Sequence, residues 1–242
     1  MIKLTRGRYA VRMAETDADI RAAQALRALC FDLDAPLDAD AFDNRCTHLL
    51  IHRVSDGALV SCFRMLPLTG AEISHSYSAQ YYELSALSAY DGKMVEMGRF
   101  CVHPQAVDPD ILRVAWGAMT RFVDDNGVEL LFGCSSFAGT ETADYLDAFA
   151  MLKARHLAPK RWLPRVKAPN VFRFAARLRR KPDAKKAMLR MPPLLRTYLL
   201  MGGWVSDHAV VDDQMNTLHV FTGVEIGAIP PARKRLLRAV AG

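Results

Sequence analysis

Apolar residues recur at two spacings along the chain, and segments of the two kinds alternate. Residues 19–31, DIRAAQALRALCF, have the helical spacing, and Thr16 or Asp17 can open the helix. Residues 46–54 and 58–66 alternate apolar with polar or small residues, as strands do, and Asp56-Gly57 between them is a strong hairpin signal. The pattern therefore predicts a helix followed by a hairpin.

The same reading extends to the rest of the chain. Further strands are predicted at 8–14, 93–104 and 128–137, and further helices near 80–87, at 108–127 and at 141–156. The order β, α, β, β, short α, β, α, β, α predicts an α/β fold around a mixed sheet. Beyond residue 158 we expect helices at 171–181, 192–202 and 231–241 and strands at 204–211 and 217–226. We therefore divide the chain into an α/β core, 1–158, and a basic C-terminal portion packed on it, 159–242, which completes the sheet.

Composition places the protein among soluble or peripheral proteins. The 242 residues, 51% of them hydrophobic, suffice for a full core. Arg64 and the Gly202-Gly203 pair interrupt the most apolar stretches, and the N-terminus has no run typical of a signal peptide. The five cysteines are odd in number and form no CxxC pair, which is typical of reduced thiols. We expect a cytoplasmic protein.

Positive charge is concentrated in one part of the chain. Residues 153–190 hold fourteen Lys or Arg and one acid, so the net charge of this span is +13. The rest of the chain has a net charge of −7, which gives the total of +6. Such a block predicts an anionic partner: nucleic acid, a phospholipid surface or an acidic protein. In 171–181, VFRFAARLRRK, the charges lie opposite an apolar stripe, as in a helix at an anionic membrane or in one packed on its own core.

The strand KMVEMGRFCVHP, residues 93–104, carries Glu96 and Arg99 among apolar neighbours. In a regular strand these two side chains would point to opposite faces. A β-bulge at Gly98 would shift the phase, so that Glu96, Arg99, Cys101 and His103 share one face and the apolar residues the other. The pair is then either a structural ion pair or a catalytic base with an arginine that orients it or holds a substrate carboxylate.

Long stretches of the chain resemble one enzyme family. EMGRFCVHP, LFGCSSFAGT, PPLLRTYLLMGGWVSDHAVVD and NTLHVF are similar to the L-ornithine N-alpha-acyltransferases of ornithine-lipid synthesis, over nearly the whole chain. The resemblance implies the GNAT acyltransferase fold, a mixed twisted sheet with a splayed, bulged central strand, here followed by a C-terminal extension of helices and strands. A sparser pattern is shared with acyl-homoserine-lactone synthases: Arg27, Phe31, Asp40, Asp43, Arg64, Glu96 and Arg99.

The resemblance implies a reaction and a set of site residues. An acyl thioester is attacked by the α-amine of an amino acid, and Glu96 is the candidate base because amines near neutral pH are mostly protonated. Backbone N–H groups of Phe100, Cys101 and Val102 would hold the oxyanion. The candidate substrate contacts are Arg99 and Arg64 for a carboxylate, Asp40 and Asp43 for a side-chain ammonium, Arg27 and Phe31 for closing the site, and Ser135 and Ser136 for pantetheine amides. Structural roles remain open for each of them.

The chain departs from CoA-dependent members of the fold in one loop. Those members hold the pyrophosphate with a glycine-rich loop at a helix N-terminus. Here the stretch is HPQAVDPDILR, without glycine and with two aspartates. This favours acyl carrier protein as the donor, acting through its phosphopantetheine arm, with no other cofactor. Relatives commonly carry Asp where this chain has His219, so the resemblance leaves the role of that residue open.

The sequence leaves other functions open. The acceptor is ornithine by resemblance, with glutamine or glycine as alternatives, and an acyl-homoserine-lactone synthase is a second enzymatic reading. A basic protein that binds nucleic acid or membrane without chemistry is the alternative of a different class, although we expect no nucleic-acid partner. His48 and His52 share a strand face but lack a third ligand, so no metal is expected.

Overall fold

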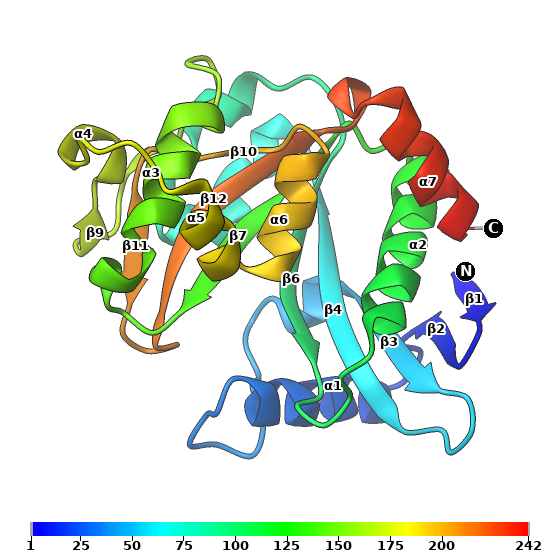
Figure 1. Ribbon diagram of the computed structural model, residues 1–242. Helices are drawn as coiled ribbons and strands as arrows, with labels where there is room; N and C mark the ends of the chain where they lie inside the picture. The colour runs from blue at the N-terminus through cyan, green and yellow to red at the C-terminus, as the bar shows by residue number, and fades with distance from the viewer. Residues whose placement is uncertain (1, 242) are drawn as a thin grey trace. The chain divides into compact units, whose positions relative to one another are not determined.

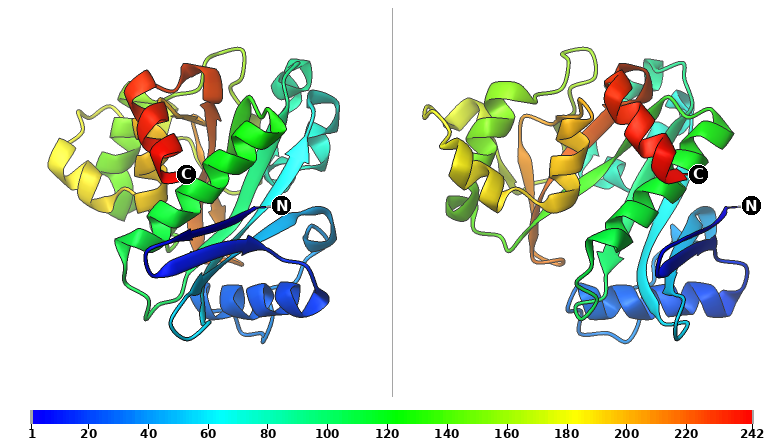
Figure 2. Two further views of the ribbon diagram at one scale, coloured as in Figure 1. Left: turned by 90° about the vertical axis from the view of Figure 1, so that its right-hand side faces the viewer. Right: turned by 45° about the vertical axis from the view of Figure 1, so that its right-hand side comes forward.

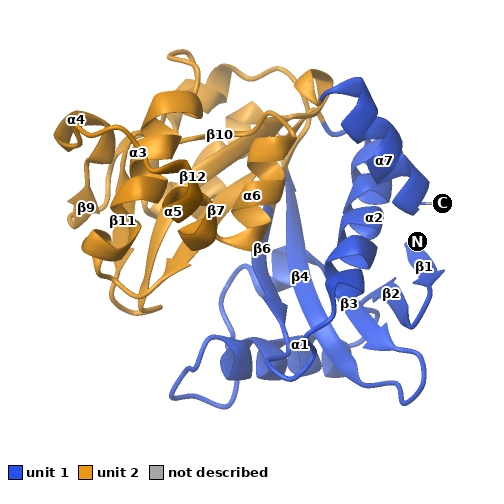
Figure 3. Cartoon of the chain, in the orientation of Figure 1, with its two compact units in different colours: residues 1–67, 97–128, 230–242 blue, residues 68–96, 129–229 orange. Residues whose placement is uncertain are grey.

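The computed structural model describes residues 2–241, which divide into two compact units (Figure 3). Unit 1 takes its residues from the stretches 1–67, 97–128 and 230–242, and unit 2 from 68–96 and 129–229. Each unit therefore combines segments that are distant in sequence. The units group residues from both sides of position 158, so the division at that position remains a prediction from the sequence and is not the division into these units.

Unit 1 is a sheet with helices packed on it (Figures 1 and 2). Its strands are β1 (Lys3–Arg6), β2 (Tyr9–Met13), β3 (Thr47–Arg53), β4 (Leu59–Leu68) and the second part of β6 (Met94–Val102), in that order across the sheet. The helices are α1 (Asp17–Cys30), the short 3₁₀ turn η1 (Asp43–Arg45), α2 (Pro109–Asn126) and α7 (Pro231–Ala241). In Figure 2, α2 runs beside β1 and β2, and α7 packs along α2.

Local sequence explains the ends of these elements. Thr16 caps α1 in a capping box, because its side chain accepts from the backbone N–H of Asp19 while the Asp19 carboxylate accepts from the N–H of Thr16. Helix α2 ends at Gly127, whose φ of 62° is left-handed. Gly57, with a φ of 70°, turns the β3–β4 hairpin as predicted.

Unit 2 is built on β7 (Leu130–Ala138) and β12 (Thr217–Glu225), which pair antiparallel along nine residues each. Its sheet has the order β6, β7, β12, β11, β9, and β10 also pairs with β12. The other strands are β5 (Tyr82–Glu83), β8 (Arg165–Val166), β9 (Val171–Phe172), β10 (Trp204–Val205) and β11 (Ala209–Asp212). The α-helices are α3 (Leu146–Arg155), α4 (Phe174–Arg177), α5 (Ala184–Arg190) and α6 (Pro193–Leu200). The 3₁₀ turns are η2 (Gly70–His75), η3 (Ser78–Gln80), η4 (Ser85–Ala89), η5 (Thr142–Tyr145) and η6 (Ile226–Ala228).

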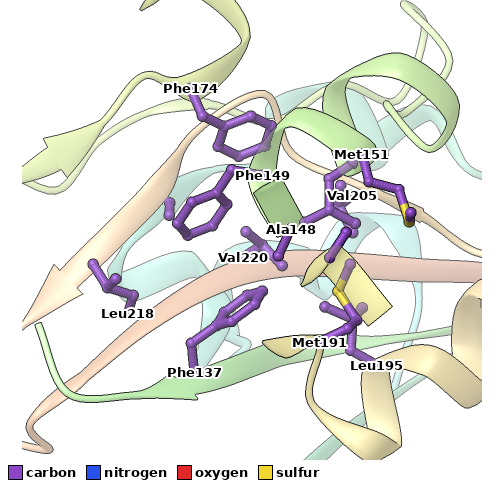
Figure 4. Packing of buried hydrophobic residues seen from close by; sticks show 13 residues of the cluster. Phe137, Ala148, Phe149, Met151, Phe174, Met191, Leu195, Val205, Leu218 and Val220 are labelled. Carbon is purple, nitrogen blue, oxygen red and sulfur yellow. The ribbon is translucent and has the colours of Figure 1, made fainter. Parts of the chain in front are cut away.

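The core of unit 2 lies between β7 and β12 on one side and α3 to α6 on the other (Figure 4). Phe137 of β7 and Val220 of β12 meet Phe149 of α3, and the rings of Phe149 and Phe174 stack at 5.2 Å between centroids. These residues are fully or almost fully buried. Burying such side chains stabilises a fold by about 1.5 to 3 kcal/mol each.

Most predicted elements are confirmed, and the exceptions lie where tertiary contacts decide. The helix predicted at 171–181 is wrong: Val171 and Phe172 form β9, and α4 is a single turn ending at Arg177. The strand predicted at 204–211 is interrupted between β10 and β11. The helix predicted near 80–87 is also wrong: Tyr82 and Glu83 form β5, between the 3₁₀ turns η3 and η4. Strand β1, strand β8 and helix α5 had no predicted counterpart. Across residues 2–241, none of the helices combines the length and apolar character that a bilayer span requires.

Candidate functional site

Three arginines and three aspartates of unit 1 form a closed ring of ion pairs. In order around the ring the members are Asp38, Arg27, Asp43, Arg64, Asp40 and Arg99. They come from the last turn of α1, the loop after it, η1, β4 and β6. Each guanidinium contacts two carboxylates and each carboxylate two guanidiniums, so the six formal charges of the ring cancel.

The inner half of the ring is almost inaccessible to solvent. Arg27 Nη2 lies 2.9 Å from Asp43 Oδ2, and Arg64 Nη1 lies 2.7 Å from Asp43 Oδ1, with Arg27 1% and Asp43 3% exposed. Gln24 donates a further hydrogen bond to Asp43. Burial alone would raise the pKa of Asp43, but the hydrogen bonds from Arg27 and Gln24 outweigh it and hold that pKa well below its usual range.

The outer half of the ring is more accessible. The side chains of Arg99 and Asp40 are 13% and 23% exposed, and their closest charged atoms are 3.4 Å apart. Arg64 also holds Asp40, at 2.6 Å. Burial alone would raise the pKa of Asp40, but the hydrogen bond from Arg64 and its positive charge outweigh burial and lower that pKa. This edge of the ring offers both signs of charge to a polar molecule.

Sequence reasoning selected five of the six ring members and missed Asp38. The Oδ2 atom of Asp38 lies 2.9 Å from Nε of Arg27 and 2.9 Å from Nε of Arg99. Nothing in the acidic loop FDLDAPLDADAFD distinguishes Asp38 from its neighbours. Only the fold shows which aspartate completes the ring.

The backbone of β6 changes phase at Gly98 and Arg99. A side chain at Gly98 would face Arg64, whose Nε lies 3.8 Å from the ideal Cβ position, and Arg99 reaches the same side through Asp40. Two consecutive residues therefore face one side, as in a β-bulge. The left-handed residue is Arg99, with a φ of 54°, and not Gly98. For a residue with a side chain this conformation is strained and is typical of functional positions.

Phe100 and Cys101, the two residues after the bulge, alternate as the bulged register predicts. The ring of Phe100 packs against Phe63 at 5.6 Å between centroids, while Cys101 Sγ lies 3.5 Å from Cys62 Sγ. Phe63 and Cys62 are neighbours on β4 and point to opposite faces. Cys30 donates a weak hydrogen bond to the carbonyl of Val102. The use of the N–H groups of Phe100 to Val102 as oxyanion donors stays a prediction.

Arg27 and Phe31, predicted to close the site together, lie in different surroundings. Arg27 is a ring member, whereas Phe31 packs against the apolar cluster of α1, β3, β4 and β6. Both contacts are structural, and their role at a substrate stays a prediction.

Glu96 lies in unit 2 and accepts hydrogen bonds from Tyr77 and Ser78. Its Oε1 accepts from the backbone N–H and the hydroxyl of Ser78, at 2.7 and 2.5 Å, and its Oε2 accepts from the N–H of Tyr77 at 2.7 Å. The carboxylate is 4% exposed. Hydrogen bonds to a carboxylate favour its charged form, the form that a base requires, and they fix its orientation. Sequence reasoning missed Ser78, because no local pattern places it beside Glu96.

A thiol adjoins this carboxylate. The Sγ atom of Cys134 in β7 lies 3.4 Å from the hydroxyl oxygen of Ser78. That hydroxyl donates its hydrogen bond to Glu96. Glu96 pairs in register with Phe132, so Glu96, Phe132 and Cys134 lie on the same face of the sheet in unit 2. This face is the one on which η3 lies.

The two serines predicted to contact pantetheine point to opposite faces of β7. Ser135 is buried with Phe137 and accepts a 2.9 Å hydrogen bond from the hydroxyl of Thr222. Ser136 is exposed and lies opposite His219 of β12, on the face of Cys134. The geometry favours Ser136 for a ligand contact on this face, and the role of both residues stays a prediction.

His219 is a buried neutral imidazole. The hydroxyl of Tyr82 donates to the backbone carbonyl of His219 at 2.8 Å, so toward Nδ1, 3.1 Å away, it acts as the acceptor, and Nδ1 carries the ring proton. The Nε2 lone pair has no hydrogen-bond partner within residues 2–241. Burial lowers the pKa of His219 to about 4, with the charge of Asp212 opposing the shift.

No group of three or more His, Cys, Asp or Glu side chains in the described part of the chain has the arrangement of a metal site. All five cysteines are free thiols.

Comparisons with known proteins agree with the fold. The acetyltransferase (GNAT) domain family matches residues 10–117. The L-ornithine N(alpha)-acyltransferase of Rhodobacter capsulatus is 32% identical over 229 residues, covering 88% of this chain and 88% of that protein. The enzyme of the same name from Rhizobium meliloti is 30% identical over 240 residues, 90% of this chain and 80% of that protein. The solved structure of FeeM, an N-acyl amino acid synthase from uncultured soil microbes, aligns with a TM-score of 0.54 over 91% of this chain and 93% of that one, at 10% identity, which shows a shared fold.

Proposed function

Because the chain belongs to the family of L-ornithine N(alpha)-acyltransferases, we propose that it transfers a 3-hydroxy fatty acyl group from acyl carrier protein to the α-amine of L-ornithine, giving lyso-ornithine lipid. The observation that carries this proposal is the 32% identity over 88% of both chains. This identity directly supports an acyltransferase activity. Ornithine as the acyl acceptor and acyl carrier protein as the acyl donor are supported by separate features of the structure.

The ring of ion pairs supports a zwitterionic acceptor. Ornithine carries one carboxylate and two ammonium groups, and the accessible edge of the ring presents Arg99 beside Asp40. In our proposal the substrate carboxylate pairs with Arg99 and the side-chain ammonium pairs with Asp40, while Arg64, which is 3% exposed, holds Asp40 in position. Arg27 and Asp43 lie in the buried half and hold the outer members in position.

The N-terminus of α2 supports a carrier-protein donor over CoA. A CoA pyrophosphate would use the free N–H groups there, but the carboxylate of Asp108 already accepts from the N–H of Asp110 at 3.0 Å. The same carboxylate is held by Arg8 at 2.6 Å and by the hydroxyl of Tyr9 at 2.8 Å. A second anion at this position would meet a fixed negative charge.

Glu96 is our candidate for the base that takes the proton from the α-ammonium group. We expect Glu96→Gln to lower kcat by about a hundredfold or more, the usual size of a general-base effect. Glu83→Gln is the matched control, because Glu83 is a glutamate of the same unit that caps a local turn. Near-normal turnover of the Glu96 variant would assign that carboxylate a structural role.

The reaction is tested by incubating the protein with 3-hydroxyacyl carrier protein and following release of the carrier thiol. The acceptor panel contains L-ornithine, L-glutamine, glycine and S-adenosylmethionine, and a matched arm replaces the carrier by the acyl-CoA of the same chain length. The proposal expects release with ornithine and carrier protein, and much slower release with CoA. Release only with another acceptor would assign that substrate instead, and no release with any acceptor would contradict the enzymatic function.

A further inference from the structure

The outward face of α5 combines exposed apolar and basic side chains. Ala187 is fully buried in the core of unit 2, and Leu189, two residues on, points nearly opposite to it and is 81% exposed. Met188 beside it is 41% exposed. These two side chains, with Lys185, Lys186 and Arg190, are named here the α5 surface. Large apolar side chains at such exposure contribute nothing to the core.

Basic residues surround this apolar tip. Residues 173–190 contain eight Lys or Arg, all exposed: Arg173, Arg177, Arg179, Arg180, Lys181, Lys185, Lys186 and Arg190. The single acid of this stretch, Asp183, caps α5, because its carboxylate accepts from the backbone N–H groups of Lys185 and Lys186. Little negative charge is left to offset the lysines and arginines.

The surface is held in place before any partner binds. Asp147 of α3 accepts from the guanidinium of Arg180 at 2.8 Å and from the N–H of Asp183 at 3.0 Å. Lys153 of α3 donates to the carbonyl of Leu178 at 2.7 Å. A preformed surface loses little conformational freedom on binding.

We propose that the α5 surface binds the face of an anionic lipid bilayer, with Leu189 and Met188 entering the interface and the basic side chains against lipid phosphates. Positive charge alone would equally suit an acidic carrier protein, but two exposed apolar side chains at the tip of a basic helix favour a bilayer, which takes them up. Each Lys or Arg near an anionic membrane adds to the attraction, and salt screens it. The proposal goes beyond the acyl transfer and does not depend on it.

The amphipathic pattern at 171–181 suits either a membrane surface or packing on the protein's own core. Phe174 is buried there, so the apolar stripe belongs to the core. The exposed apolar side chains lie instead on helix α5, which the sequence pattern did not predict.

The test is flotation of the purified full chain with vesicles. Neutral phosphatidylcholine vesicles are compared with vesicles containing about 30% phosphatidylglycerol, at low and at high salt. We expect flotation only with the anionic vesicles and its loss at high salt. Leu189→Ser and the double change Lys185→Gln/Lys186→Gln are each expected to weaken binding about tenfold or more.

Matched controls lie on other surfaces. Val54→Ser removes an apolar side chain that is 56% exposed in the hairpin turn, and Lys3→Gln/Arg21→Gln removes two exposed charges from unit 1. The controls are expected to bind as the unchanged protein does. Absence of flotation, or equal losses in variants and controls, would overturn the proposal. So would a carrier protein that binds through Lys185 and Lys186 while vesicles do not bind.

Discussion

Ser78 donates a 2.5 Å hydrogen bond from its hydroxyl to Oε1 of Glu96, the carboxylate that we propose as the base. A hydrogen bond to a charged group contributes about 1.5 to 3 kcal/mol. Ser78→Ala leaves the two backbone donors in place and removes this bond together with the 3.4 Å contact between the hydroxyl and Cys134 Sγ. We therefore expect the hydroxyl to act by positioning the carboxylate.

We expect Ser78→Ala to lower kcat by about tenfold. We also expect the rise of kcat with pH to occur at higher pH, because the carboxylate loses a donor that favours its charged form. The measurement is steady-state thiol release across pH. Ser88→Ala is the control, since its hydroxyl bonds only a local carbonyl and is exposed. An unchanged profile would show that Ser78 does not act through Glu96.

Asp43 supports the whole ring, so its loss affects stability. Asp43→Ala leaves Arg27 and Arg64 in a buried site without their shared carboxylate. Breaking a buried ion pair in this way costs about 3 to 5 kcal/mol of unfolding free energy. Urea unfolding measures this loss, and Asp34→Ala in the same loop, which is exposed, is expected to change it little. Equal stability of the two variants would contradict a structural role for the ring.

Arg99 combines a charge with a left-handed backbone, and two substitutions separate these features. Both Arg99→Gly and Arg99→Ala remove the ion pairs with Asp38 and Asp40. Only glycine adopts a φ of 54° without strain, so we expect the glycine variant to be more stable than the alanine variant by about 1 kcal/mol. Thermal and urea unfolding of the pair measure the difference. An alanine variant of equal or greater stability would contradict the strained bulge.

The depressed pKa of His219 makes folding depend on pH. Between an unfolded pKa of about 6.5 and the folded pKa of about 4, the unfolded chain binds the proton that the folded chain does not. The stability is therefore complete above about pH 6.5 and falls as the pH decreases toward 4, by about 2 to 3 kcal/mol. We expect His219→Asn to show a flatter dependence of unfolding free energy on pH over this range. A slope identical to that of the unchanged protein would contradict a buried neutral imidazole.

The sequence predicted the fold well where local signals and tertiary packing agree. The capping box at Thr16 and the glycine after α2 mark real helix ends, and the misphased charges in β6 indicated the bulge. The position of the strain was not predictable in detail, because a glycine is the expected site of a positive φ and the chain uses Arg99 instead.

Other features depended on contacts that no local pattern encodes. The helical spacing at 171–181 was misleading because Phe172 belongs to a strand and the N–H of Ala175 bonds the carbonyl of Asp207 from a distant loop. Helix α5 escaped prediction because Ala187 is its only buried residue. Of the candidate site, the arginines and Asp40 and Asp43 were found by resemblance, whereas Asp38 and Ser78 required the fold.

The proposed reaction acylates the α-amine of ornithine, and two acceptors that differ only at that amine distinguish it from acylation of the side chain. The protein is supplied with 3-hydroxyacyl carrier protein and either L-ornithine or Nα-acetylornithine, and the acylated product and the position of its new amide are followed by mass spectrometry. The account predicts an amide product from the acceptor with a free α-amine and none from the acceptor whose α-amine is blocked. Acylation of Nα-acetylornithine would place the reaction at the side chain and contradict the account.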